Sequence, residues 1–186
     1  MIKTFYAKNR TAWRAWLKKN YKTQKEVWLV YPHKSTCKPR VGYNDAVEEA
    51  LCFGWIDSQV RNIGPDSAAQ RFSPRNPKTT YSQANIERLN ALYKEGKLMP
   101  EVKTGIKGII LARFKFPDDI IEELRKDKTV WKNYSKYPAA YKRIRVAFIN
   151  GARNRPAEFE KRMAYLIKMT KQNKMFGFGG VDKYFV

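Results

Sequence analysis

The chain has 186 residues, enough for one domain or for one domain with a helical extension. Its 38 Lys and Arg against 17 Asp and Glu give a net charge of +21, and 14% of the residues are aromatic. Aromatic residues spread along the chain exclude a disordered basic tail, and no apolar run is long enough to cross a membrane. The charge favours nucleic acid, an anionic membrane surface or a small anionic molecule as partner. The alternative is a basic, soluble protein whose charge is an adaptation to its host's cytoplasm.

The compartment is predicted from the start of the chain and from the cysteines. Met1–Thr4 leads into a polar, charged segment that does not resemble a signal peptide. Cys37 and Cys52 are too few for a disulfide framework, and Cys52 is expected to be a reduced, buried thiol. These features predict a cytoplasmic protein, and they indicate no oligomeric state.

The first third of the chain predicts a helix, a strand and a second helix. Thr11 is the expected N-cap of the first helix. Glu26–Tyr31 is apolar on both faces and so predicts a central strand that ends at Pro32. Asn44–Phe53 predicts a helix with three acids toward its N-terminus, where the helix dipole favours them. Gly54 is its natural end.

The next residues predict a hairpin. Trp55–Arg61 and Ala68–Ser73 have strand composition, and Asn62–Asp66 between them is a cluster of turn residues. With the central strand they form a small antiparallel sheet of about three strands. Ser82 is expected to cap a following helix, whereas Pro100–Phe116 is ambiguous between strand and buried helix.

From Pro117 onward the pattern is helical and basic. Pro117, Pro138 and Pro156 each predict the start of a helix, and the tail, residues 176–180, is flexible by composition. We therefore predict an α+β protein, in which a small antiparallel sheet covered by helices in residues 1–112 is followed by a basic C-terminal helical region in residues 113–186.

Known catalytic and metal-binding motifs are absent from the sequence. One histidine, His33, and two distant cysteines do not make a metal site. There is no nucleophile elbow, no Walker loop and no dinucleotide-binding glycine pattern. We predict no metal and no cofactor, and the absence of these motifs favours a protein that is not an enzyme.

A first candidate site is predicted around the hairpin. Asp57 beside Trp55 is expected to be partly desolvated, which suits a general acid or base, and Arg71 with Arg75 has the chemistry of an anion clamp. Structural ion pairs, core packing and helix capping are the alternatives. The predicted residues for a small anionic ligand are Trp55, Asp57, Arg71, Arg75, Ser82 and Asn85.

A second candidate site is the basic surface of the last two helices. Basic residues interleaved with Tyr141 and Tyr165 are suited to following a phosphate backbone. The alternative is a solvated helical face. The predicted residues for an anion or nucleic-acid surface are Lys142, Arg143, Arg145, Arg153, Arg155, Lys161, Arg162, Lys168 and Lys171.

Several segments carry a family resemblance: Ala50–Ser58, Gln70–Arg75, Tyr81–Asn85, Tyr141–Arg145 and Ala152–Arg162. They resemble the YdeI/OmpD-associated family, also called bacteriocin-protection proteins, although Tyr81 stands where such proteins often have Trp. The resemblance implies a role in protection against bacteriocins, cationic peptides or envelope stress, and it assigns no catalytic residue.

Three functions follow as hypotheses. The first is a bacteriocin-protection or envelope-stress accessory protein that binds an anionic partner without catalysis. The second is a nucleic-acid-binding module that uses the last two helices. The third is an enzyme with a small-molecule pocket at Trp55, Asp57, Arg71 and Arg75.

Overall fold

The structure is a computed structural model that describes residues 3–177 and 180–184, so part of the predicted flexible tail, residues 178–179, lies outside the described residues. The chain forms two compact units, and their division passes through two helices, α3 (Gln83–Lys94) and α4 (Pro100–Leu111). A boundary at residue 112 stays a prediction. The units consist of Met1–Thr80 with Leu89–Gly108, and of Tyr81–Arg88 with Ile109–Val186.

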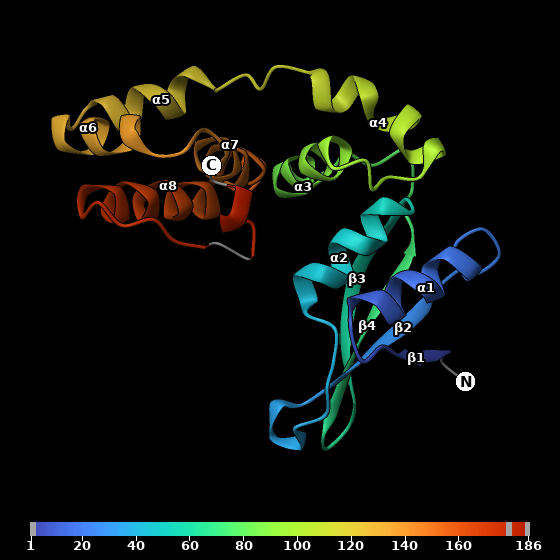
Figure 1. Ribbon diagram of the computed structural model, residues 1–186. Coiled ribbons are helices and arrows are strands. Elements are labelled where there is room, and N and C mark those ends of the chain that lie inside the picture. Colours follow the sequence, from blue (N-terminus) through green and yellow to red (C-terminus); the bar gives the residue numbers. More distant parts are fainter. Residues whose placement is uncertain (1–2, 178–179, 185–186) are drawn as a thin grey trace. The chain divides into compact units, whose positions relative to one another are not determined.

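A four-stranded sheet in the order β1-β2-β4-β3 forms the centre of the first unit (Figure 1). β2 pairs antiparallel with β4, and β4 pairs antiparallel with β3. β1 was not predicted, and it pairs parallel with β2, so the sheet is mixed rather than wholly antiparallel. The central place of β2 explains why it is apolar on both faces. The strands are β1 (Thr4–Tyr6), β2 (Val27–Pro32), β3 (Trp55–Gly64) and β4 (Ser67–Pro74).

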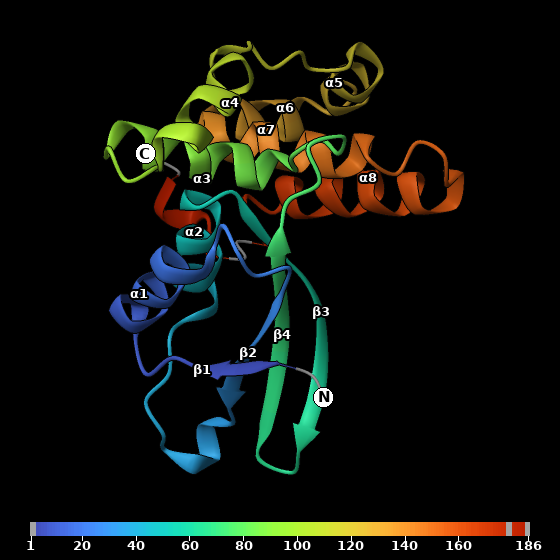
Figure 2. The ribbon, with the colours of Figure 1, turned by 90° about the vertical axis from the view of Figure 1, so that its right-hand side faces the viewer.

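The β3–β4 hairpin is longer than its sequence predicts. β3 continues to Gly64, so the turn expected from Asn62 contracts to Pro65 and Asp66. A bulge between Asp57 and Val60 shifts the register, which re-aims the side chains that follow it. Figure 2 shows the far end of the hairpin extending beyond α1 (Arg10–Asn20) and α2 (Tyr43–Cys52), and β3 is exposed there.

Two helices, α1 (Arg10–Asn20) and α2 (Tyr43–Cys52), cover one face of the sheet. The ring centroids of Trp13 and Phe72 lie 5.2 Å apart, which packs α1 on β4. The N-cap of α1 is Asn9 and not Thr11, because Asn9 has an extended backbone and accepts a hydrogen bond from the Ala12 N–H.

Ion pairs join α1 to α2 beneath this aromatic layer. The Arg10 guanidinium contacts Asp45 at 2.8 Å, Glu48 at 3.0 Å and Glu49 at 2.5 Å. Arg14 adds a second contact to Glu49 at 2.6 Å. Of the three acids that the sequence predicts near the positive end of α2, only Asp45 lies in the first turn, so Glu48 and Glu49 are held by these guanidiniums instead.

The ambiguous segment after Pro100 is helical. Ser82 caps the preceding helix α3 as predicted, since the Asn85 N–H donates to its hydroxyl at 3.3 Å. α4 runs on to Leu111, and both Ile109 and Leu111 are exposed. The apolar run in this helix is therefore neither a strand nor buried, contrary to both expectations.

Helices α5 to α8 build the second unit, in which α8 packs on α6 and α7. α6 was not predicted as a separate helix; Asp127 starts it by accepting hydrogen bonds from the Thr129 and Val130 N–H groups. The helices are α5 (Asp118–Arg125), α6 (Lys128–Lys136), α7 (Ala139–Asn150) and α8 (Pro156–Lys171). Short 3-10 helices occur at Lys34–Thr36 and Asp182–Tyr184.

The core of the second unit is made by apolar and tyrosine side chains of all four helices. It is formed by Ile120, Leu124, Val130, Tyr134, Tyr137, Tyr141, Val146, Ile149, Met163 and Leu166. The α+β class and the helical C-terminal region are confirmed. Within the described residues, no helix has both the length and the apolar character needed to cross a membrane.

Candidate anion-binding pocket

Trp55, from the first candidate site, is a core residue. Its side chain is buried against Trp16 at a centroid distance of 5.8 Å, and its indole N–H donates to the Tyr21 carbonyl at 3.1 Å. Because both the ring and its donor are engaged, Trp55 has no free face for a ligand in this state.

Asp57 and Arg71 lie on opposite faces of the sheet. Phe72 is the residue paired with Asp57, and adjacent residues of a strand point to opposite faces. The Asp57 carboxylate instead accepts hydrogen bonds from the Tyr43 hydroxyl at 2.9 Å and the Gln70 amide at 2.7 Å. Arg71 forms an ion pair with Glu26 at 2.8 Å.

The remaining residues of the first candidate site have contacts of their own. The Arg75 N–H donates to the Gly54 carbonyl at 2.9 Å, next to the start of β3. Ser82 and Asn85 belong to the second unit, where Ser82 caps α3 and Asn85 accepts from Arg88 at 3.0 Å. A ligand site formed by these six residues stays a prediction.

The second candidate surface is divided by ion pairs. Lys142 donates to the Ser135 carbonyl at 3.1 Å, whereas Arg155, Lys161 and Lys168 are exposed and contact no carboxylate among the described residues. The remaining basic residues, apart from Arg145, form the ion pairs Arg143–Glu87, Arg153–Asp119, Arg162–Glu158 and Lys171–Asp127.

Three residues of this surface, Arg145, Lys161 and Arg162, converge on a pocket between α7 and α8, which we call the α7–α8 pocket. Its volume is about 130 Å³. Cationic side chains thus meet aromatic ones over an apolar floor. The other lining residues are Phe148, Ile149, Glu158, Tyr165, Leu166 and Phe176.

Arg145 is the unusual residue of this pocket. Its guanidinium carbon lies 5.6 Å from the Phe148 ring centroid and 5.3 Å from that of Phe176, and one terminal nitrogen donates to the Gly177 carbonyl at 3.0 Å. Its buried Nε has no acceptor, and no carboxylate pairs with it among the described residues. Burial lowers the pKa of Arg145 from its ordinary value. A desolvated cation without a counter-charge favours the arrival of an anion.

Arg162 fixes the aromatic wall. Its guanidinium carbon lies 3.7 Å from the centroid of Phe148, and a terminal nitrogen donates to the Phe148 carbonyl at 2.6 Å. Its Nε contacts Glu158 at 2.7 Å, and this hydrogen bond holds the pKa of the Glu158 carboxyl below its usual value. Phe148 and Tyr165 remain about half exposed, so each ring keeps apolar surface that a ligand can contact, although Arg162 covers one face of Phe148.

Gly177 holds Arg145 in place through its carbonyl, which accepts the hydrogen bond from the guanidinium. Its φ of +65° is a left-handed conformation, and a Cβ there would lie 2.5 Å from a terminal nitrogen of Arg145. This backbone conformation favours glycine, and a larger side chain would have to displace the Arg145 guanidinium. Sequence reasoning did not include Phe148, Phe176 and Gly177 in a candidate site. Phe148 could have been found from its i, i+3 spacing to Arg145, which places both residues on one helix face.

The described residues contain no group of three or more His, Cys, Asp and Glu side chains placed to hold a metal ion. In the first unit, Tyr31 has a buried hydroxyl without an acceptor, and burial together with nearby Asp57 raises its pKa. This tyrosine is a further polar neighbour of Asp57 that sequence reasoning missed.

The fold and the pocket define an α+β protein with a helical unit that carries a basic and aromatic pocket. Residues 5–104, more than half of the chain, match the family described as "Domain of unknown function (DUF8412)", and the chain belongs to this family. Residues 113–173 match the family described as "Bacteriocin-protection, YdeI or OmpD-Associated", which confirms the predicted resemblance for the helical region. The Ala50–Ser58 motif lies within the first match. No curated protein and no solved structure matches the chain.

Proposed function

We propose that this protein is a cytoplasmic bacteriocin-protection or envelope-stress accessory that acts by binding an anionic partner in the α7–α8 pocket. The role rests on the family match over residues 113–173. The binding rests on one observation: the half-buried guanidinium of Arg145 faces three aromatic rings and no carboxylate in the described residues.

The pocket chemistry narrows the ligand. A volume of about 130 Å³ suits one anionic group rather than a large molecule. Arg145 and Lys161 supply positive charge, and Arg162 holds Phe148 in place. The exposed apolar surface of Phe148 and Tyr165 favours an anion attached to a planar ring. A phosphate or carboxylate on an aromatic or nucleobase-like group fits this description.

A thermal-shift panel tests the proposal with inorganic pyrophosphate and nucleoside 5′-monophosphates as probes. A ligand that binds only the folded state raises the melting temperature, and the rise grows with the ratio of ligand concentration to Kd. We expect a rise for the wild type and for the control Lys168→Met, whose residue lies on α8 outside the pocket lining. We expect little rise for Arg145→Met. Equal shifts in Arg145→Met and wild type would refute the pocket as the binding site.

Nucleic acid is the second candidate partner, and a specific arrangement favours it. Lys161, Tyr165 and Lys168 follow one another at i, i+4 and i+7, so they lie along one face of α8. A row of cations with an exposed aromatic ring suits a single strand whose bases stack. Anisotropy with labelled single-stranded RNA should show weaker binding and a shallower salt dependence in Lys161→Glu/Lys168→Glu. Unchanged affinity and slope would exclude this face.

A further inference from the structure

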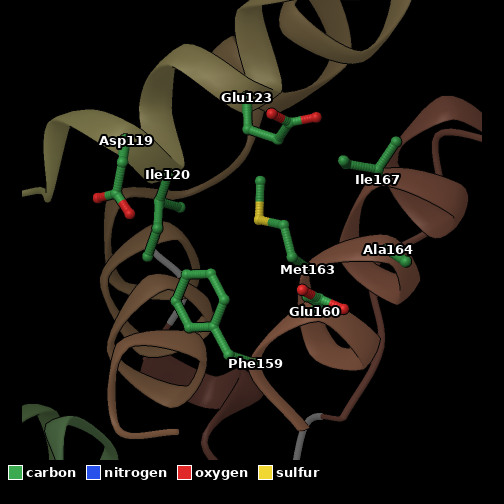
Figure 3. A pocket seen from close by; sticks show the side chains of 8 residues that line it. All are labelled: Asp119, Ile120, Glu123, Phe159, Glu160, Met163, Ala164 and Ile167. Carbon is green, nitrogen blue, oxygen red and sulfur yellow. The ribbon is translucent and has the colours of Figure 1, made fainter. Parts of the chain in front are cut away.

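A second pocket of the helical unit has the opposite charge. It is a groove of about 370 Å³ between α5 and α8, which we call the acidic groove. Figure 3 shows Phe159 and Met163 projecting from α8 toward α5. Its apolar lining is Ile120, Phe159, Met163, Ala164 and Ile167, and its carboxylates are Asp119, Glu123 and Glu160.

The charge of the groove departs from that of the chain. Lys and Arg outnumber Asp and Glu by 38 to 17 in the sequence. Among the described residues that line the groove, there are three carboxylates and no Lys or Arg. α5 supplies two of the carboxylates, one helical turn apart, and α8 supplies the third. The apolar floor is therefore bordered by negative charge from both helices.

These carboxylates are available to an incoming cation. Asp119 pairs with Arg153 at 2.7 Å and Glu123 pairs with Lys126 at 2.6 Å, but all four side chains of these pairs are more than 40% exposed. Exposed pairs contribute little and exchange readily. Glu160 is exposed and has no ion-pair partner among the described residues.

Arg153 of the protein itself shows how a cationic side chain binds at the edge of the acidic groove. Its guanidinium carbon lies 5.2 Å from the Phe159 ring centroid while a terminal nitrogen contacts Asp119. Two residues of the groove thus already provide an aromatic face and a carboxylate to one guanidinium. Glu123 and Glu160 offer carboxylates beside the rest of the apolar floor.

We propose that the acidic groove docks a basic amphipathic helix of a partner protein. Apolar anchors of that helix, spaced i, i+3, i+4 and i+7, would fill the floor at Ile120, Met163 and Ile167. Its Lys or Arg side chains would contact Glu123 and Glu160 at the border. A polyanion is repelled by this border, so the groove and the α7–α8 pocket take partners of opposite charge. The inference does not depend on the proposed function.

The probe is a fluorescein-labelled helical peptide with Leu at the anchor positions and Lys elsewhere, measured by anisotropy with the full chain. A second peptide replaces every Lys with Gln and keeps the Leu spacing. At 0.15 M salt the Debye length is about 8 Å, which limits long-range repulsion by the net charge. We expect the Lys peptide to bind at least tenfold more tightly than the Gln peptide.

Variants locate the binding. Glu123→Lys/Glu160→Lys reverses the border, and Ala164→Trp fills the groove from an exposed position. Each variant should bind the Lys peptide at least tenfold more weakly than the wild type does. Glu122→Lys is the matched control, because Glu122 is exposed on the same helix but does not line the groove. It should change the affinity less than twofold, and circular dichroism melting would verify that every variant is folded.

Three outcomes would overturn the proposal. One is no binding of the Lys peptide to the wild type. Another is weakening by Glu122→Lys that is, on a logarithmic scale, half that of Glu123→Lys/Glu160→Lys, because the control changes half the charge and only net charge would then matter. The third is a dimer in sedimentation that Ala164→Trp dissociates, which would assign the groove to a second copy of this chain.

Discussion

Arg143 and Glu87 form a two-point ion pair within the helical unit. The Arg143 Nε contacts Glu87 Oε1 at 2.7 Å, and a terminal nitrogen contacts Oε2 at 2.8 Å. The Glu87 side chain is only 7% exposed and that of Arg143 is 30% exposed. This pairing raises the pKa of Arg143 and occupies a residue that the sequence predicted for an anion-binding surface.

The pair should matter for stability. Glu87→Gln leaves a half-buried guanidinium without its counter-charge, and breaking a buried pair in this way costs roughly 3 kcal/mol. Urea denaturation measures the change in free energy of unfolding. Glu122→Gln is the control, since Glu122 is exposed on α5. Equal stability of Glu87→Gln and this control would contradict the structural role of the pair.

Arg10 should contribute more to the free energy of unfolding than the Arg143–Glu87 pair does. Its guanidinium contacts three carboxylates, and two of them, Glu48 and Glu49, belong to side chains that are 2% and 3% exposed. Arg10→Met removes this contact and leaves buried carboxylates, with an expected loss of about 3–5 kcal/mol. Lys19→Met, on the exposed end of the same helix, should change the free energy of unfolding by less than about 0.5 kcal/mol. A similar loss in both variants would argue against the network.

The two cysteines should differ in reactivity. Cys37 is exposed and Cys52 is buried. Burial, followed by the nearby carboxylate of Glu49, raises the pKa of the Cys52 thiol to about 11. Since the thiolate is the reactive species, Ellman's reagent at pH 8 should modify one thiol quickly in the native protein and two after denaturation. Cys37→Ser should remove the fast reaction; its persistence would place Cys52 at the surface.

The same shift predicts a pH dependence of stability. The thiol of Cys52 ionises near 9 in the unfolded chain but near 11 in the fold, so the folded state binds more protons between these values. The stabilisation of the fold by the protonated Cys52 thiol is therefore present below pH 9 and is lost as the pH rises toward 11. The stability difference between wild type and Cys52→Ala should therefore narrow by roughly 2 kcal/mol over this range. A constant difference in denaturation experiments would contradict the shift.

The α+β class follows from local pattern, and so do most elements. The apolar segment at Val27–Pro32 and the turn residues after Ile63 are sufficient to predict a central strand and a hairpin. β1 could not be predicted, because three residues carry no periodic signal and its pairing with β2 spans an intervening helix. α6 was missed since only two residues, Lys126 and Asp127, separate it from α5.

The candidate sites were less predictable because they depend on partners distant in the chain. Arg143 and Glu87 are 56 residues apart, and no local pattern pairs them. Arg71 is excluded from Asp57 by strand register, since Phe72 and not Arg71 lies opposite Asp57. The basic composition of α7 and α8 indicated a cationic face, but only the packing shows which cations have carboxylate partners.

The most direct measurement is a titration of ¹⁵N-labelled protein with inorganic pyrophosphate, followed through the Nε–H signals of Arg145 and Arg143 by NMR. The two signals are assigned by their loss in Arg145→Lys and Arg143→Lys. The central claim predicts that the Arg145 signal moves and saturates, whereas the Arg143 signal stays in place because Glu87 holds that guanidinium. An unmoved Arg145 signal across the titration would contradict anion binding in the α7–α8 pocket.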